Sequence, residues 1–315
     1  MPTIFITGAT GFIGRALSVK MLERGWRVLG TYRRNLLSAN LPAGVEGLQI
    51  ESIENCNEVE SRLKGVDVVV HLAGRAHILN DNLNDNLGVF RRVNVAGTER
   101  LAQAAARADV KKFIFISSIK VNGESSPIPY TEKSIPAPKD AYGVSKYEAE
   151  QALAKVSAQT GLKTVILRPP LVYGAGVKAN FKTLIKIVAS GLPLPFKSIH
   201  NRHSFIYLEN LTEAIFTCII HPRADGEIFL VSDGQDVAIP DLIKMVACAM
   251  NKKVVLFSLH PNILKALCRI AGKSESLKKL TGSLFIDSSK IRNLLGWNPT
   301  FTLAEGIRET VKYYK

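Results

Sequence analysis

Three side chains near the middle of the chain have the types and spacing of a proton-transfer group. Tyr142 and Lys146 lie four residues apart in a stretch, 140–153, whose pattern predicts a helix, so both side chains fall on one helix face. A free tyrosine, with a pKa of about 10, is a poor base at neutral pH, and a nearby lysine ammonium is expected to lower that pKa. Ser118 follows a predicted strand at 112–116 and is expected to hydrogen-bond the reacting oxygen. The three residues together indicate acid–base chemistry on a substrate oxygen.

Residues 3–14, Thr-Ile-Phe-Ile-Thr-Gly-Ala-Thr-Gly-Phe-Ile-Gly, have the pattern of a strand, a tight turn and a helix that bind a dinucleotide. Gly8 allows the positive φ of a sharp turn, Gly11 has no Cβ to hold a phosphate away, and Gly14 lets the helix pack closely on the strand. The free N–H groups at the helix N-terminus then attract a pyrophosphate. The spacing is Gly-x-x-Gly-x-x-Gly rather than the Gly-x-Gly-x-x-Gly of ordinary dehydrogenases. A glycine turn without a ligand is the other interpretation.

The end of the next predicted strand, 25–32, bears on the choice between NAD and NADP. An acidic residue at this place binds the 2′-hydroxyl of NAD, whereas a basic residue accommodates the 2′-phosphate of NADP. The strand ends at Tyr32 and is followed by Arg33 and Arg34, without an acid. We therefore expect NADP(H), with Arg33 as a cofactor-binding residue and NAD(H) as the alternative cofactor. If the two arginines are only solvated surface residues, this preference has no basis.

The order of the predicted elements indicates an α/β fold with a Rossmann-like, doubly wound parallel sheet and a smaller α/β substrate-binding domain. The continuous apolar run Val68–Val70 is typical of a parallel strand buried on both faces. Ligands in such folds bind at the carboxyl ends of the strands. The residues expected there beside the cofactor are Ser52 and Ile53, which would flank the adenine, and Leu72, Ala73, Gly74 and Ser117.

Composition and charge limit the classes of function. A chain of 315 residues with 46% hydrophobic content buries one large core or two joined ones. No apolar run has membrane-spanning length and no signal-peptide pattern precedes the first strand, so we expect a cytoplasmic protein without an integral membrane segment. Four cysteines without metal-ligand spacing predict reduced thiols and no metal site. The net charge of +14 suits an anionic small substrate, an acidic membrane surface or nucleic acid, but no Lys/Arg block with interleaved aromatics supports nucleic acid.

Further motifs extend along the whole chain. They are Thr7-Gly8-Ala-Thr-Gly11-Phe12-Ile13-Gly14, His71-Leu-Ala-Gly74, Asn94-Val-Ala-Gly97-Thr98, Ser117-Ser118, Tyr142-x-x-x-Lys146, Leu167-Arg-Pro169-Pro-Leu-Val-Tyr-Gly174, Arg202-His-Ser-Phe-Ile-Tyr207 and Leu295-Gly-Trp-Asn-Pro299. Together they resemble the extended short-chain dehydrogenases/reductases that act on nucleotide sugars, which include UDP-hexose 4-epimerases, sugar-nucleotide 4,6-dehydratases and 4-ketoreductases.

The resemblance implies roles for individual residues. Tyr142 would be the acid/base, Lys146 would bind the nicotinamide ribose and tune the tyrosine, and Ser118 would hold the substrate oxygen. Further cofactor contacts are implied for Phe12, Ile13, Asn94 and Pro169. Substrate contacts are implied for Arg202, on the diphosphate of UDP, and by a looser match for Asn180 and Phe196.

The resemblance also implies how the chain is divided and assembled. A Rossmann domain would span residues 1–171, with 203–232 returning to its sheet, and a discontinuous nucleotide-sugar-binding domain would span 172–315. A homodimer is expected by analogy with the family. The segment 259–273 alternates apolar and basic residues, so it would either cover the substrate pocket as a helix or touch a membrane surface.

Departures from the family pattern narrow the expected chemistry. Dehydratases carry an Asp-Glu pair directly after the position of Ser118, where this chain has Ile119 and Lys120, so a 4,6-dehydratase is not expected. Leu171 replaces an asparagine that contacts the UDP-sugar in typical UDP-galactose epimerases, and Tyr32 replaces their NAD-selecting aspartate. Both changes weaken the epimerase interpretation.

The expected activity is therefore reduction of the C4 ketone of a UDP-4-keto-6-deoxy-(N-acetyl)hexosamine. The stretch 118–123 resembles that of ketoreductases that make such nucleotides, although Asn122 stands where many relatives carry tyrosine. A UDP-hexose or UDP-N-acetylhexosamine 4-epimerase with bound NAD is the alternative enzyme. An NADP-binding sensor or scaffold without catalysis is a third hypothesis, although it would have no use for the three proton-transfer residues. Surface-polysaccharide precursor synthesis is the pathway that fits the resemblance.

Overall fold

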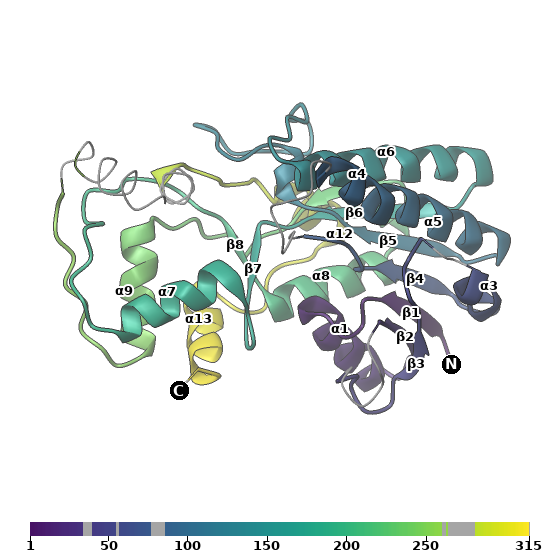
Figure 1. Cartoon of the computed structure of the whole chain (residues 1–315), viewed down its shortest axis with the longest axis horizontal. Helices are drawn as coiled ribbons and strands as arrows, with labels where there is room; N and C mark the ends of the chain where they lie inside the picture. Colours follow the sequence, from purple (N-terminus) through teal and green to yellow (C-terminus); the bar gives the residue numbers. More distant parts are fainter. Residues whose placement is uncertain (34–39, 55–56, 77–85, 260–262, 264–280, 315) are drawn as a thin grey trace.

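Seven strands form one parallel sheet in the order β3-β2-β1-β4-β5-β6-β9. The strand order reverses between β1 and β4, which places a crevice at their carboxyl ends. The expected doubly wound parallel sheet is thus confirmed in this computed structural model (Figure 1). The strands are β1 (Thr3–Thr7), β2 (Arg27–Tyr32), β3 (Glu46–Gln49), β4 (Val68–His71), β5 (Lys112–Ile116), β6 (Lys163–Arg168) and β9 (Ile228–Leu230).

The structure describes residues 1–33, 40–54, 57–76, 86–259, 263 and 281–314. Arg34, two of the four cysteines (Cys56 and Cys268) and nearly all of the segment 259–273 lie outside these residues. Within the described part of the chain, no helix is long and apolar enough to cross a membrane.

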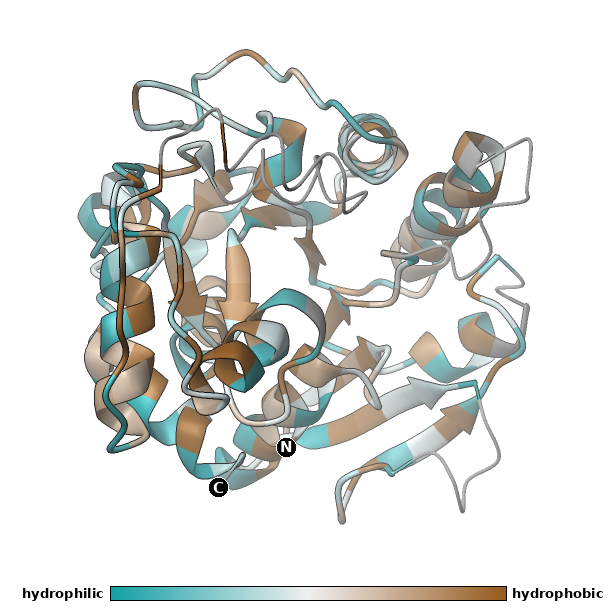
Figure 2. Cartoon of the chain, turned by 60° about the vertical axis from the view of Figure 1, so that its left-hand side comes forward, coloured by the Kyte–Doolittle hydropathy of each residue, from teal (hydrophilic) through white to brown (hydrophobic). Residues whose placement is uncertain are grey.

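Helices cover both faces of the sheet because alternate strand residues point to opposite sides. One core joins Phe5, Val69 and Phe113 to helices α3 (Asn57–Leu63), α5 (Gly97–Arg107) and α6 (Ala141–Thr160). The other core joins Ile4 and Val70 to helices α1 (Phe12–Glu23), α8 (Leu208–Ile220) and α12 (Ser289–Leu295). In Figure 2 the helices carry both hydrophilic and hydrophobic positions, as expected for helices that bury one face.

A smaller lobe lies beside the sheet, on the left of Figure 1. Its core packs helices α7 (Ala179–Ala189), α9 (Ile239–Ala249) and α13 (Leu303–Lys312) against the aromatic residues Tyr173, Phe205 and Tyr207. These aromatic residues come from a separate pair of parallel strands, β7 (Leu171–Tyr173) and β8 (Phe205–Tyr207).

The region 203–232 departs in part from what we expected. It contributes β9 to the large sheet, but β8 pairs with β7 instead. The reason is that Phe205 and Tyr207 are buried with Tyr173 in the aromatic core of the smaller lobe, which keeps β8 away from the sheet edge. The boundary between the two expected domains stays a prediction.

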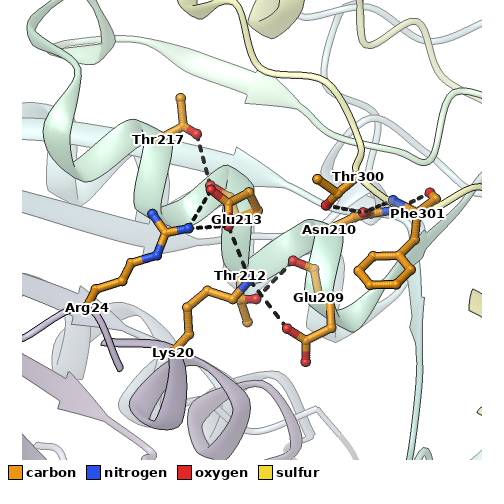
Figure 3. A network of polar contacts seen from close by, with 9 residues as sticks. All are labelled: Lys20, Arg24, Glu209, Asn210, Thr212, Glu213, Thr217, Thr300 and Phe301. Carbon is orange, nitrogen blue, oxygen red and sulfur yellow. Dashed lines mark hydrogen bonds and ion pairs between the residues drawn. The ribbon is translucent and has the colours of Figure 1, made fainter. Parts of the chain in front are cut away.

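Helix α8 connects the two lobes through polar contacts on both of its sides (Figure 3). Glu213 of α8 accepts hydrogen bonds from Lys20 and Arg24 of α1 at 3.2 and 2.8 Å. Asn210 is fully buried, and its amide bonds both the N–H and the carbonyl oxygen of Phe301, at 3.0 and 2.8 Å, just before α13. The side-chain amide of Asn210 thus fixes the segment at Phe301, which leads into α13 of the smaller lobe.

We expect Asn210→Ala to lower the free energy of unfolding by about 2–4 kcal/mol, because both backbone groups of Phe301 lose their partner in a poorly solvated place. Asn293→Ala, on the exposed surface of α12, serves as the control and should change stability by less than about 0.5 kcal/mol. Urea unfolding measures both values. Equal stability of the two variants would contradict the role given to Asn210.

Candidate active site

The glycine turn between β1 and α1 has the geometry that its sequence predicts. Gly8 has a φ of +70°. A Cβ at Gly14 would lie only 2.2 Å from the carbonyl oxygen of Gly8, so no other residue fits there without moving backbone. Gly11, the N-cap of α1, has no side chain to cap the helix. The N–H groups of the first turn are therefore available to an anion at the floor of the crevice.

Two cavities that share part of their lining open beside this turn. The larger, of about 760 Å³, extends from Gly8 and Gly11 past the ends of β2 and β3. The smaller, of about 270 Å³, extends from the same glycines to the carboxyl end of β5. The predicted cofactor residues that line the larger cavity are Gly8, Gly11, Arg33, Ser52, Ile53, Leu72, Ala73 and Gly74. Those that line the smaller one are Gly8, Gly11, Phe12, Ile13, Gly14, Leu72, Gly74, Ser117, Tyr142, Lys146 and Pro169.

The smaller cavity brings together the three predicted catalytic residues. Tyr142 and Lys146 come from the first two turns of α6, and Ser118 follows β5 directly. The Ser118 hydroxyl is a hydrogen-bond partner of the Tyr142 side chain. Lys146 is 4% exposed, donates a 2.8 Å hydrogen bond to the carbonyl oxygen of Ile116 and lies 4.4 Å from the centre of the Phe115 ring. Local helix spacing and the end of one strand thus create the expected cluster.

The protonation of this cluster differs from what we expected. Loss of solvent around its hydroxyl, with the nearby Asp140 carboxylate, raises the pKa of Tyr142 to about 12. The expectation that Lys146 lowers the pKa of Tyr142 was wrong for the protein alone, because burial is the larger effect. Burial also lowers the pKa of Lys146 to about 8, against the attraction of Glu150. Near neutral pH, Tyr142 is therefore a protonated acid and Lys146 a buried cation.

Asn94 lies behind the cavities and lines neither of them. It sits in a π-helical segment, Arg91–Ala96, and is 1% exposed. Its amide accepts from the N–H of Arg75 at 2.8 Å and donates to the Arg75 carbonyl oxygen and the Ser145 hydroxyl at 3.0 and 2.9 Å. Asn94 thus joins the loop after β4 to helix α6, which carries Tyr142 and Lys146. It positions these two elements and is not itself part of the lining of either cavity.

A buried polar chain beneath the turn was missed by sequence reasoning. The Thr7 hydroxyl lies 2.7 Å from Nδ1 of His71 and accepts from the N–H groups of Leu72 and Ala73. On the other side of the ring, Nε2 lies 3.0 Å from the Thr98 hydroxyl. Burial lowers the pKa of His71 to about 3, so the ring is neutral. The sequence signal for this chain was that the apolar runs of β1 and β4 each end in a polar residue, Thr7 and His71.

The predicted substrate residues lie elsewhere. Arg202, Asn180 and Phe196 line neither cavity. Arg202 is largely exposed, pairs with Asp236 at 2.9 Å and stacks over the Phe285 ring at 4.4 Å. Phe196 packs against the core of the smaller lobe. The structure therefore does not bring these three residues to the proton-transfer cluster.

The larger cavity fits a phosphate-bearing ligand. Among the described residues that line it, the cationic side chains outnumber the acidic one, Glu54. The Nε of Arg75 is buried and has no hydrogen-bond partner in the described part of the chain, as expected of a group that awaits an anion. Thr10, Arg15 and Lys178 also line the larger cavity and were missed by sequence reasoning. Thr10 lies within the glycine motif and Arg15 directly follows it, so both could have been found there, whereas Lys178 is remote from it in the sequence.

Comparisons with known proteins agree with this geometry. Residues 4–232 match the NAD dependent epimerase/dehydratase family. The chain is 39% identical to the UDP-glucose 4-epimerase of Vibrio cholerae, with 99% of this chain and 95% of the relative covered. A solved UDP-glucose 4-epimerase of Thermotoga maritima, determined with UDP-glucose, has a TM-score of 0.79 at 25% identity and covers 99% of this chain and 98% of that chain. The UDP-glucuronic acid 4-epimerase of Bacillus cereus, solved in complex with NAD, shares the fold with a TM-score of 0.80 at 23% identity, covering 99% and 96%.

We expect kcat/KM to fall as the pH rises through about 8, by about tenfold per pH unit, because Lys146 then loses its proton. In the unfolded chain the pKa of Lys146 has its ordinary value of 10.5. Between about pH 8 and pH 10.5 the unfolded state therefore binds more protons than the folded state, so this group makes the folded state more stable as the pH rises. The loss of activity must therefore occur in folded protein. A pH–rate profile, with circular dichroism at each pH, measures both, and a flat profile up to pH 10 would contradict the assignment.

Proposed function

Because the chain belongs to the NAD dependent epimerase/dehydratase family, as its motifs predicted, we propose that it transfers hydride at C4 of a UDP-linked hexose or hexosamine with NAD(P) as cofactor. The observation that carries the proposal is that Ser118, Tyr142 and Lys146 line the same cavity as the glycine turn. Proton transfer and dinucleotide binding are thereby joined in one crevice.

The residues of the chain have separate tasks in this proposal. The nicotinamide, when bound, supplies or accepts hydride. The glycine turn and the N-terminus of α1 hold the diphosphate, and Ser52 and Ile53 flank the adenine. Ser118 hydrogen-bonds the oxygen at C4, and Tyr142 donates a proton to that oxygen as negative charge develops. Lys146, held on the carbonyl oxygen of Ile116, stabilises the phenolate that Tyr142 becomes.

The geometry best supports a net reduction of a C4 ketone. Reduction needs a proton donor, and the raised pKa of Tyr142 keeps its hydroxyl protonated. It also consumes reduced cofactor, and the exposed Arg33 lines the larger cavity beside Thr31 and Tyr32, without an acid at the end of β2. The second feature favours NADPH as the cofactor. The proposed ketone, a UDP-4-keto-6-deoxy-(N-acetyl)hexosamine, rests on the resemblance of residues 118–123 to the same stretch of ketoreductases.

A 4-epimerase is the second candidate, and similarity favours it. The Vibrio cholerae relative described above carries that name at 39% identity over nearly the whole chain. An epimerase would use the same three residues, oxidise C4, turn the sugar and reduce the other face with a cofactor that stays bound. The binding of a UDP-sugar by Arg202, Asn180 and Phe196, which line neither cavity, is part of either proposal. A homodimer and a division at residue 171 are likewise proposed.

We expect Tyr142→Phe to lower turnover by about 10²–10⁴-fold while cofactor binding stays within a few-fold, because only the transferable proton is removed. A discontinuous assay with UDP-sugars measures turnover, and calorimetric titration with NADPH and NAD measures cofactor binding. Near-normal turnover would remove the catalytic role from Tyr142. Cofactor binding by a wild type without turnover on any UDP-sugar would favour the sensor or scaffold hypothesis.

The net reaction is decided by the cofactor balance. The nucleotide released on denaturation of the purified protein is identified first, and fresh enzyme is then mixed with NADPH and a UDP-4-keto-6-deoxy-N-acetylhexosamine. Rapid loss of NADPH absorbance without a bound nucleotide establishes the ketoreductase. Tightly bound NAD, with interconversion of UDP-glucose and UDP-galactose or of their N-acetylated forms, establishes the epimerase and rejects the reductase.

We expect Arg33→Asp to weaken NADPH binding by about 10–100-fold relative to NADH, because a charge-assisted contact with the 2′-phosphate is replaced by repulsion. Arg308→Asp on the exposed side of α13 changes the net charge equally and should leave the ratio of the two dissociation constants unchanged. Direct titration with both cofactors gives that ratio. An unaltered ratio in Arg33→Asp would remove the basis for an NADP preference.

A further inference from the structure

We propose that Glu150 is a positioning residue that keeps Lys146 protonated, and that its ion pair with Arg168 sets the strength of this effect. The inference rests on the role proposed above for Lys146. It concerns a buried pair of opposite charges to which neither the resemblance nor the proposed mechanism assigns a role, and which is joined by a hydrogen bond to Ser117 in the lining of the smaller cavity.

Glu150 lies on α6, the same helix that carries Lys146. Glu150 follows Lys146 by four residues, one helical turn further along the buried face of α6. Both residues are 4% exposed, so little water screens the attraction between them. Burial therefore preserves the attraction between the ammonium and the carboxylate, which the pairing of Glu150 with Arg168 partly offsets.

The Glu150 carboxylate is fully engaged. Nε and one terminal nitrogen of Arg168 donate to its two oxygens at 2.9 and 2.5 Å, in the bidentate arrangement that suits a guanidinium. The Ser117 hydroxyl donates to Oε1 at 2.5 Å. Ser117 also lines the smaller cavity, so the network reaches the surface of the site.

Arg168 is anchored on its far side by Asn122. The other terminal nitrogen of Arg168 donates to Oδ1 of Asn122 at 3.1 Å, and both residues are at most 3% exposed. Asn122 follows the short helix that carries Lys120, and its Nδ2 donates to the carbonyl oxygens of Thr131 and Ser134 at 3.4 Å. The arginine is therefore fixed at the end of β6, where it holds the carboxylate and at the same time opposes the charge of Lys146.

The remaining groups that face Lys146 do not replace this attraction. On α6 the other titratable neighbour is Tyr142, which is protonated. His71 at the end of β4 is neutral. The π-helical segment offers Asn94, an amide, and β5 offers the Ile116 carbonyl oxygen and the Phe115 ring. Among the described residues, Glu150 is the carboxylate whose charge raises the pKa of Lys146 against desolvation.

The decisive measurement is the pKa of Lys146 itself. Competitive labelling of lysine amines with acetic anhydride between about pH 6 and about pH 11, read by peptide mass spectrometry, reports it without any need for turnover. Glu150→Gln keeps the size and an oxygen acceptor for Ser117, removes the charge and leaves Arg168 cationic. We expect the pKa of Lys146 to fall by about one unit or more, and the alkaline limb of kcat/KM to move by the same amount.

Two further variants separate charge from packing. In Glu150→Gln/Arg168→Gln the repelling guanidinium is also gone, so the pKa of Lys146 should return toward the wild-type value although more native contacts are lost. Glu148→Gln, on the same helix, removes a partly exposed carboxylate and should leave the pKa unchanged. A merely structural role predicts instead that the double variant is the most impaired. Near-wild-type activity of Glu150→Gln below the shifted limb would show that the site is still assembled.

The possible failures are distinguishable. An unchanged labelling pKa in folded Glu150→Gln overturns the inference about Glu150, whatever the activity. A shifted labelling pKa with no matching shift of the pH–rate profile supports the electrostatic coupling and overturns the role of Lys146 in the proposed function. If Glu150→Gln does not fold, Arg168→Gln tests the other half of the pair. The pKa of Lys146 should then rise above the wild-type value, because the charge of Glu150 is no longer opposed, and an unchanged value would overturn the inference.

Discussion

The close approach of α1 to the turn after β1 is the constraint on which the site depends. With no Cβ at Gly14, the helix backbone can lie against the Gly8 carbonyl, where any side chain would come within 2.2 Å. This contact aims the free N–H groups of the first helical turn at the crevice between β1 and β4. Such an arrangement suits the diphosphate of a dinucleotide. Because the sheet is parallel, the carboxyl ends of its other strands lie at the same edge as this turn.

Polar groups at those strand ends join the elements that surround the crevice. Thr7 joins the turn to His71 at the end of β4, and Asn94 joins the loop after β4 to Ser145 on α6. Because these groups are buried, each must have a partner, and each partner comes from a different element. Cofactor turn, β4 loop and catalytic helix are therefore positioned by one connected set of hydrogen bonds rather than by separate local contacts.

Burial also sets the chemistry of the cluster. Loss of solvent raises the pKa of Tyr142 and lowers the pKa of Lys146. The same environment therefore keeps the tyrosine protonated and favours loss of the proton from the lysine. A carboxylate one turn along α6 opposes the second effect, at the cost of a buried arginine to hold it. In the proposed mechanism, the balance of these charges sets the upper pH limit of activity.

The sequence by itself determined the parallel sheet, the glycine turn and the pairing of Tyr142 with Lys146, because these depend on periods of two or four residues and on conformations that only glycine adopts. Nearly all predicted cofactor residues line the crevice for the same reason: they follow strands whose ends must meet. Tertiary structure alone decided the rest. Lys178 reaches the crevice from a distant part of the chain, and Asn94 lines neither cavity. Strand β8 pairs outside the large sheet, and the pKa of Tyr142 rises instead of falling. Each of these depends on burial and on neighbours remote in sequence, which no local pattern records.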